Sequence, residues 1–143
     1  MLYYCEQLGN NVSAGISAMG NPLIWWAGIP AFIFLVYRIF KNRDRMAFFL
    51  CVGYMAQYLP WVMVSRCIFI YHYFPSVPFV ILMVGYSIYT LVKAKPKLKY
   101  AALVYVLLCA ALFVAFYPVI SGYPISLDYG KYLKWFSDWV LIY

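Results

Sequence analysis

The sequence predicts an all-α integral membrane protein with four transmembrane helices, both termini external, and an interfacial C-terminal helix. Its 143 residues are 67% hydrophobic and only 10% charged, with a mean hydropathy of +0.81. Soluble domains are about half apolar and about one quarter charged, and a soluble fold of this size would expose too much apolar surface. Apolar runs of near-transmembrane length recur along the chain, and short basic clusters separate them. These observations together favour the membrane class.

Four spans are predicted, at about residues 22–40, 46–64, 76–92 and 100–120, within a single membrane domain that covers residues 1–143. Each approaches the ~20 residues that a helix needs to cross ~30 Å of hydrocarbon, and the third is the shortest. Helix is the expected form, because four such runs cannot close a membrane barrel. Pro30 and Pro60 lie within spans, where each is expected to bend its helix.

The loops between the spans predict the orientation of the chain. Eight of the eleven basic residues lie in the first and third loops: Arg38, Lys41, Arg43, Arg45, Lys93, Lys95, Lys97 and Lys99. Two spans separate these loops, so both face one side, which the positive-inside rule makes the cytoplasm. The N-terminal tail (1–21), the turn at 65–75 and the C-terminal tail (121–143) then face outward. The net charge of +7 thus indicates topology and contact with membrane lipids rather than nucleic acid.

The C-terminal tail is too often interrupted by charge to be a fifth span. Aromatic side chains recur there every three or four residues, at Tyr132, Trp135, Phe136 and Trp139. Charged side chains recur at similar spacing on another part of the surface, at Asp128, Lys131, Lys134 and Asp138. This pattern predicts an amphipathic helix in the outer interface, with a lid packed on the bundle as the alternative.

The spans contain no acidic residue, because Glu6, Asp44, Asp128 and Asp138 all lie in loops or tails. Proton-coupled transport usually needs an ionisable group inside the bundle, so a small proton-coupled exporter is disfavoured. No phosphate-binding loop, serine-hydrolase elbow or zinc-protease motif occurs, and no cysteine or histidine pair has metal spacing. We therefore predict no catalytic residue, no metal and no cofactor in this chain.

The four cysteines do not predict a disulfide framework. Cys51 and Cys109 lie in apolar runs and are expected to be small core residues. Cys5 and Cys67 are predicted to face the same side of the membrane. Whether they pair remains open, because sequence spacing does not establish proximity.

The turn at residues 65–75, SRCIFIYHYFP, is the candidate binding site. It carries Arg66 and His72, the only histidine of the chain, among apolar and aromatic residues. An arginine offers a planar fork of donors for phosphate oxygens, and a histidine adds a donor near neutral pH. Residues six apart do not share a helix face, so their convergence requires a bend, which Pro75 favours. Simple anchoring in the aromatic belt of the membrane is the alternative, and periodicity alone favours it.

Several stretches resemble the C-terminal four-span region of protein O-mannosyltransferases, most closely that of the bacterial members. They are ISAMGNPLIWWAGIPAF, YLPWVMVSRCIFIYHYFPSVPF, and FYPVISGYPIS followed by LKWFSDWVLIY. The order of G-N-P-x-x-W-W, P-W-x-x-x-x-R and Y-H-Y-x-P makes the resemblance specific, and it covers nearly the whole chain. The resemblance implies a membrane glycosyltransferase of the GT-C type. Such enzymes transfer mannose from a polyprenyl-phosphate or dolichyl-phosphate carrier to Ser or Thr of exported proteins, on the external side.

The resemblance also implies that the catalytic residues lie outside these 143 residues. In the family, the catalytic acidic pair lies in the first external loop of a long N-terminal part, and Glu6 alone cannot replace it. We therefore expect the chain to be inactive alone, and either to complement a separately encoded N-terminal glycosyltransferase half or to be a remnant. Polyprenyl-phosphate-mannose would give Arg66 and His72 a phosphate partner at the bacterial plasma membrane. A non-catalytic four-span scaffold or assembly protein is the alternative from another functional class.

Overall fold

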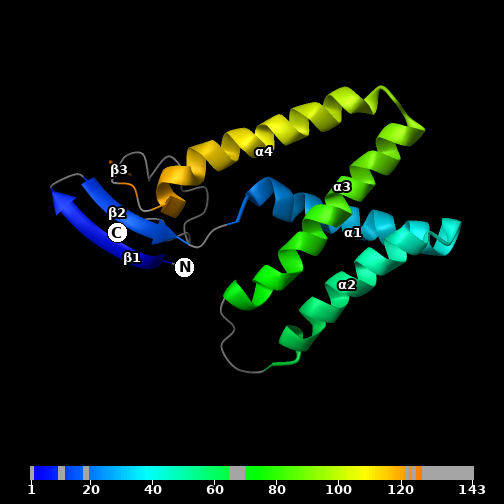
Figure 1. Cartoon of the computed structure of the whole chain (residues 1–143), viewed down its shortest axis with the longest axis horizontal. Coiled ribbons are helices and arrows are strands. Elements are labelled where there is room, and N and C mark those ends of the chain that lie inside the picture. Colours follow the sequence, from blue (N-terminus) through cyan, green and yellow to red (C-terminus); the bar gives the residue numbers. More distant parts are fainter. Residues whose placement is uncertain are drawn as a thin grey trace. The chain divides into compact units, whose positions relative to one another are not determined.

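The computed structural model describes residues 2–9, 12–17, 20–64, 70–121, 123 and 125–126. Its elements are β1 (Leu2–Gly9), β2 (Val12–Ser17), α1 (Pro22–Asn42), α2 (Arg45–Val62), η1 (Ile70–Ser76, a 3₁₀ helix), α3 (Val77–Ala94), α4 (Leu98–Ser121) and β3 (Ile125–Ser126). Figure 1 shows these elements along the chain. The four α-helices coincide with the four predicted apolar segments, and no end differs from its predicted position by more than two residues.

The chain divides into two compact units. One, which we call the helical unit, comprises residues 22–106; the other comprises residues 1–21 and 107–143. The helical unit contains α1, α2, α3 and the first turns of α4. The second unit contains the strands and the remainder of α4.

Three helical segments of the described chain are long and apolar enough to cross a membrane: Pro22–Asn42, Tyr73–Ala94 and Leu98–Ser121. Helix α2 is less apolar, because Arg45 opens it and Gln57 and Pro60 lie within it. The prediction of apolar helices of membrane-spanning length is therefore confirmed for three segments. The crossing by α2 and the external placement of both termini stay predictions.

A small sheet in the second unit was not predicted from the sequence. Its strands are antiparallel in the order β1-β2-β3, with Glu6 opposite Ala14 and Ser13 opposite Ile125. The strands lie in the two tails, so the all-α description fits the apolar segments and not the whole chain. The predicted interfacial helix from residue 129 onward lies outside the described residues.

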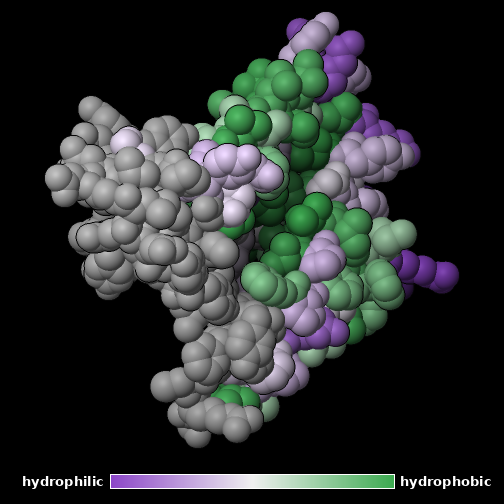
Figure 2. Space-filling view, turned by 60° about the vertical axis from the view of Figure 1, so that its left-hand side comes forward, coloured by the Kyte–Doolittle hydropathy of each residue, from purple (hydrophilic) through white to green (hydrophobic). Residues whose placement is uncertain are grey.

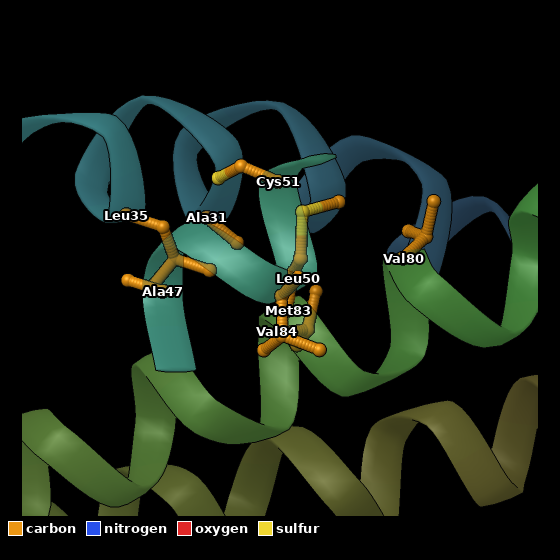
Figure 3. Packing of buried hydrophobic residues seen from close by; sticks show 8 residues of the cluster. All are labelled: Ala31, Leu35, Ala47, Leu50, Cys51, Val80, Met83 and Val84. Atoms are coloured by element: carbon orange, nitrogen blue, oxygen red, sulfur yellow. The ribbon is translucent and has the colours of Figure 1, made fainter. Parts of the chain in front are cut away.

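The core of the helical unit lies between α1, α2 and α3. Figure 3 shows its eight buried side chains, which are Ala31, Leu35, Ala47, Leu50, Cys51, Val80, Met83 and Val84. Cys51 is a buried free cysteine, as expected, and Cys109 is free and half-buried. Cys67 lies outside the described residues, so its pairing with Cys5 is untested. Beyond this core, many large hydrophobic side chains of the described residues are exposed, as expected of helices in contact with lipid. Figure 2 shows broad hydrophobic areas on the face in view, beside hydrophilic ones.

Two glycines allow α3 to approach its neighbours closely. A Cβ atom added to Gly28 in α1 would lie 2.7 Å from a methyl carbon of Val80. A Cβ atom added to Gly53 in α2 would overlap the ring of Phe79. Small residues at such contacts are the usual means by which membrane helices pack, because hydrophobicity does not drive helices together in lipid.

The two basic connections lie at the same end of the helical unit, as the loop charges predict. Helices α1 and α3 both run toward this end, and α2 and α4 both start from it (Figure 1). We call it the basic end. The opposite end holds the start of α1, the end of α2 and η1, and we call it the aromatic end.

Candidate functional site

The predicted binding turn belongs to the aromatic end, between α2 and α3. Arg66 lies outside the described residues, and at His72 the structure describes only the backbone, within η1. The convergence of these two side chains is therefore untested. What the structure describes is the surface next to them.

Helix η1 carries the chain directly into α3. Pro75 lies within η1, and another proline occupies the first turn of α3. Backbone N–H groups in the first turn of a helix have no partner within the helix, so a proline there costs no hydrogen bond. Residues 70–76 thus form the tighter 3₁₀ helix rather than an N-terminal extension of α3. Ser76, the last residue of η1 and the N-cap of α3, is buried, so the chain lies against the bundle where the turn ends.

Four aromatic side chains form a cluster next to His72, which we call the aromatic cluster: Trp25, Tyr54, Tyr58 and Tyr73. The rings of Tyr54 and Tyr58 stack with centroids 5.6 Å apart, and Tyr58 meets Tyr73 edge to face at 5.9 Å. Trp25 lies 5.0 Å from Tyr73. Since each such pair contributes about 0.5–1.5 kcal/mol beyond burial, the cluster fastens η1 to α1 and α2.

The hydroxyl oxygens of Tyr54 and Tyr73 lie 3.4 Å apart, within reach of a weak hydrogen bond. A tyrosine hydroxyl has one hydrogen to donate and can also accept. When one of the two donates to the other, the acceptor keeps its own O–H. The pair can therefore offer one donor to an anionic or carbonyl oxygen beside the binding turn.

The aromatic cluster was not predicted from the sequence as a site. The i, i+4 spacing of Tyr54 and Tyr58 on a predicted helix was a readable signal of a stacked pair. The contact between Tyr73 and the residues of α1 and α2 was not readable, because it joins positions far apart in the sequence.

The basic end holds a second polar arrangement that the sequence analysis missed. Asp44 Oδ2 accepts hydrogen bonds from Arg38 Nε at 3.1 Å and from the Tyr86 hydroxyl at 2.8 Å, and lies 2.8 Å from Arg38 Nη2. Its Oδ1 accepts from the backbone N–H groups of Met46 and Ala47 and so caps α2. We call Arg38, Asp44 and Tyr86 the Asp44 clamp. It joins the last turns of α1 and the start of α2 to the middle of α3.

The partners of the Asp44 carboxyl change its pKa. Burial raises the pKa, but the hydrogen bonds from Tyr86, Ala47 and Arg38 outweigh burial and leave it below its usual value. The carboxylate is thus held charged and fully engaged. It serves as a structural link and is not poised to exchange a proton near neutral pH.

Neither arrangement forms a catalytic centre in the described part of the chain. Asp44 is the only acidic residue between positions 7 and 127, and it lies at the opposite end from the aromatic cluster. Among the described residues, no three His, Cys, Asp or Glu side chains come together to hold a metal. The chemistry that the aromatic end offers is hydrogen-bond donation beside an aromatic surface.

Comparison with known proteins decides the family. The family described as "C-terminal four TMM region of protein-O-mannosyltransferase" matches residues 2–139. The chain belongs to this family. The resemblance carried by the sequence motifs is thereby confirmed.

Curated relatives share this region at low identity. The polyprenol-phosphate-mannose–protein mannosyltransferase of Mycobacterium tuberculosis is 28% identical over 129 residues, which are 85% of the chain and 25% of the relative. The enzyme of the same name from Corynebacterium glutamicum is 26% identical, covering 92% of the chain and 27% of the relative. The dolichyl-phosphate-mannose–protein mannosyltransferase 1 of Saccharomyces cerevisiae is 25% identical, covering 85% and 18%.

The chain therefore spans about a quarter or less of the length of these relatives. No solved structure matches it significantly. The family match, the apolar helices and the bacterial relatives together support a multi-pass protein of a bacterial membrane.

Proposed function

We propose that this chain acts as the C-terminal membrane region of a protein O-mannosyltransferase and contacts the phosphate of a polyprenyl-phosphate-mannose donor. The observation that carries this proposal is the family match over residues 2–139. The relatives are named for mannose transfer from polyprenol or dolichyl phosphate to protein. On this view the 143 residues hold the lipid carrier, and residues outside them supply the catalytic carboxylates for transfer to Ser or Thr.

The proposed phosphate contact is the turn that carries Arg66 and His72. The Arg66 guanidinium suits phosphate oxygens, because its donors form a fixed fork. The Tyr54–Tyr73 hydroxyl pair adds a donor beside His72. The aromatic cluster supports this assignment, because it holds Tyr73, near the end of the turn, against α1 and α2. A turn already held in place loses less conformational entropy when it binds a phosphate.

The proposed topology has four spans with the basic end in the cytoplasm and the aromatic end outside. Helix α2 has 18 residues, which at ~1.5 Å per residue give a length of about 27 Å, close to the ~30 Å of hydrocarbon. This orientation puts the binding turn on the side where the family's reaction is expected.

The proposal is tested by reconstitution from two parts. The chain is co-expressed with the Corynebacterium glutamicum relative from which the matching C-terminal region has been deleted. Transfer of mannose from polyprenyl-phosphate-mannose to a Ser/Thr-containing peptide is then measured in membranes. We expect neither part to transfer mannose alone and the two together to do so.

The control is the same relative split at the same point and co-expressed with its own C-terminal region. If that pair is active and the pair with this chain is not, the proposed function is contradicted, and a non-catalytic scaffold becomes the better account. Transfer by the 143 residues alone would contradict the assignment of catalysis to a separate part.

A further inference from the structure

The basic end of the helical unit presents a surface of unbalanced positive charge. Seven cationic side chains are exposed there: Lys41, Arg43, Arg45, Lys93, Lys95, Lys97 and Lys99. The only acidic residue between positions 7 and 127 is Asp44, which is engaged by Arg38, Tyr86 and the start of α2. The seven cations therefore have no carboxylate partner in that part of the chain, and Figure 2 shows hydrophilic side chains gathered along one edge.

Tyrosine rings hold two of these ammonium groups close to the ends of the helices. Lys41 Nζ lies 5.1 Å from the centroid of the Tyr37 ring and donates a hydrogen bond to its hydroxyl at 2.5 Å. Lys99 Nζ lies 5.0 Å from the centroid of the Tyr100 ring. Tyrosine and lysine at helix ends favour the level of the lipid head groups. In a membrane we therefore expect these charges at the level where phosphodiesters are concentrated.

An apolar groove opens directly beside the connection between α3 and α4. It has a volume of about 420 Å³, within the ~300–1,000 Å³ of ordinary ligand sites. Leu91, Val92 and Leu98 line it and flank the lysine-bearing connection, while Ala102 and Tyr105 line it further along α4. The Tyr105 hydroxyl already donates to the Leu23 carbonyl at 3.2 Å, so it does not make the groove polar.

We propose that the groove and the connection at residues 93–99 together form a binding site for one anionic phospholipid. One acyl chain occupies the groove between α1, α3 and α4. The phosphate lies among the lysines of the connection, which replace part of its hydration with charge-assisted hydrogen bonds. The site lies at the opposite end of the helical unit from the aromatic cluster and does not depend on the proposed mannose donor.

Charge complementarity decides the class of lipid. A zwitterionic head group brings its own cation, which the lysines repel, whereas phosphatidylglycerol carries one net negative charge that they attract. A soluble phosphate has the charge but no chain for the groove. Binding therefore requires both parts of an anionic phospholipid.

The test uses the full purified chain in a non-ionic detergent, with phosphatidylglycerol and phosphatidylcholine of identical acyl chains. Bound lipid is counted by native mass spectrometry, and the midpoint of thermal unfolding is measured in parallel. We expect phosphatidylglycerol to bind at least about fivefold more tightly than phosphatidylcholine and to raise the midpoint, because one Lys or Arg near anionic head groups contributes about a factor of five. Equal binding of the two lipids would overturn the proposal, as would an equal effect of inorganic phosphate.

Matched variants separate the two parts of the site. Lys95→Gln combined with Lys97→Gln should remove the preference for phosphatidylglycerol, while replacing both residues by arginine should keep it. Lys131→Gln combined with Lys134→Gln removes the same charge elsewhere and should leave the preference unchanged. Ala102→Trp fills the groove and should weaken phosphatidylglycerol binding without removing charge. Unchanged binding by the groove variant would show that head-group charge alone acts, which contradicts the acyl-chain site.

Discussion

At the scale of single residues, Asp44 carries more contacts than its position in a short loop suggests. One oxygen of its carboxylate caps α2, and the other receives Arg38 and Tyr86. The preceding residue, Arg43, has a positive φ of 50°, which is costly for a residue with a Cβ atom. The turn from α1 to α2 is thus strained at Arg43, and the next residue, Asp44, links the three helices.

Replacing Asp44 should destabilise the helical unit. We expect Asp44→Ala to lower the free energy of unfolding by about 2–3 kcal/mol, because the cap is lost and Arg38 and Tyr86 lose their acceptor. Asp44→Asn should cost less, since an asparagine still caps a helix. Unfolding in detergent measures both, with the exposed neighbour Arg45→Gln as control; a control as damaging as Asp44→Ala would contradict the clamp.

The same carboxylate predicts an acid-sensitive contribution to stability. Since the folded state lowers the pKa of Asp44, its contribution is fully present above the unfolded pKa of about 3.9 and is lost as the pH falls through the folded pKa. A plot of unfolding midpoint against pH should therefore fall less steeply below about pH 4 for Asp44→Asn than for the unsubstituted chain. Parallel curves for the two proteins would mean that Asp44 does not titrate in this way.

The hydroxyl of Tyr73 provides a residue-scale test of the aromatic end. Tyr73→Phe keeps the ring contacts with Trp25 and Tyr58 but removes the hydrogen bond to Tyr54. We expect a stability loss of only about 0.5–1.5 kcal/mol, together with weaker binding of polyprenyl phosphate. Binding to lipid-loaded micelles and thermal unfolding distinguish the two effects. A variant that binds the lipid normally would exclude the hydroxyl pair from the proposed contact.

At the scale of elements, the packing of α3 against α1 and α2 depends on two glycines, Gly28 and Gly53. Gly53→Ala should separate α2 from α3 and cost about 1–3 kcal/mol, because its Cβ atom would overlap the Phe79 ring. Gly85→Ala is the matched control: nothing lies within 4 Å of its added Cβ atom, so it should be neutral or stabilising. Thermal unfolding of both variants measures the difference, and equal losses would show that the close approach is not required.

The helices were predictable from the sequence because a transmembrane segment is a local property. Apolar runs of about 20 residues bounded by arginine and lysine specify α1, α3 and α4 without knowledge of any partner. The strands were not predictable by the same means, since the pairing of Ser13 with Ile125 joins opposite ends of the chain. The Asp44–Tyr86 and Tyr54–Tyr73 hydrogen bonds were missed for the same reason, although Asp44 directly before an apolar run was a readable cap signal.

At the scale of the whole molecule, the proposed orientation determines which side of the membrane each proposed ligand binds. The polyprenyl phosphate binds at the aromatic end, outside, and the anionic phospholipid binds at the basic end, in the cytoplasm. A variant that lacks Cys5 keeps Cys67 as the one cysteine predicted outside the spans. We expect a membrane-impermeant maleimide to label Cys67 in intact cells. Adding Lys95→Cys to a background that lacks both Cys5 and Cys67 should give labelling only after the membrane is permeabilised. The reverse pattern would invert the topology and move the basic end outside.

The central claim is that the turn carrying Arg66 binds the phosphate of a polyprenyl carrier. The most direct test compares the affinity of the purified chain for polyprenyl phosphate with its affinity for polyprenol. We predict that the unsubstituted chain prefers the phosphate by about tenfold or more, the usual value of a hydrogen bond to a charged group. Arg66→Ala should abolish this preference. Lys95→Gln combined with Lys97→Gln, at the other end of the helices, should preserve it. An unchanged preference in Arg66→Ala, or its loss only in the lysine variant, would contradict the account.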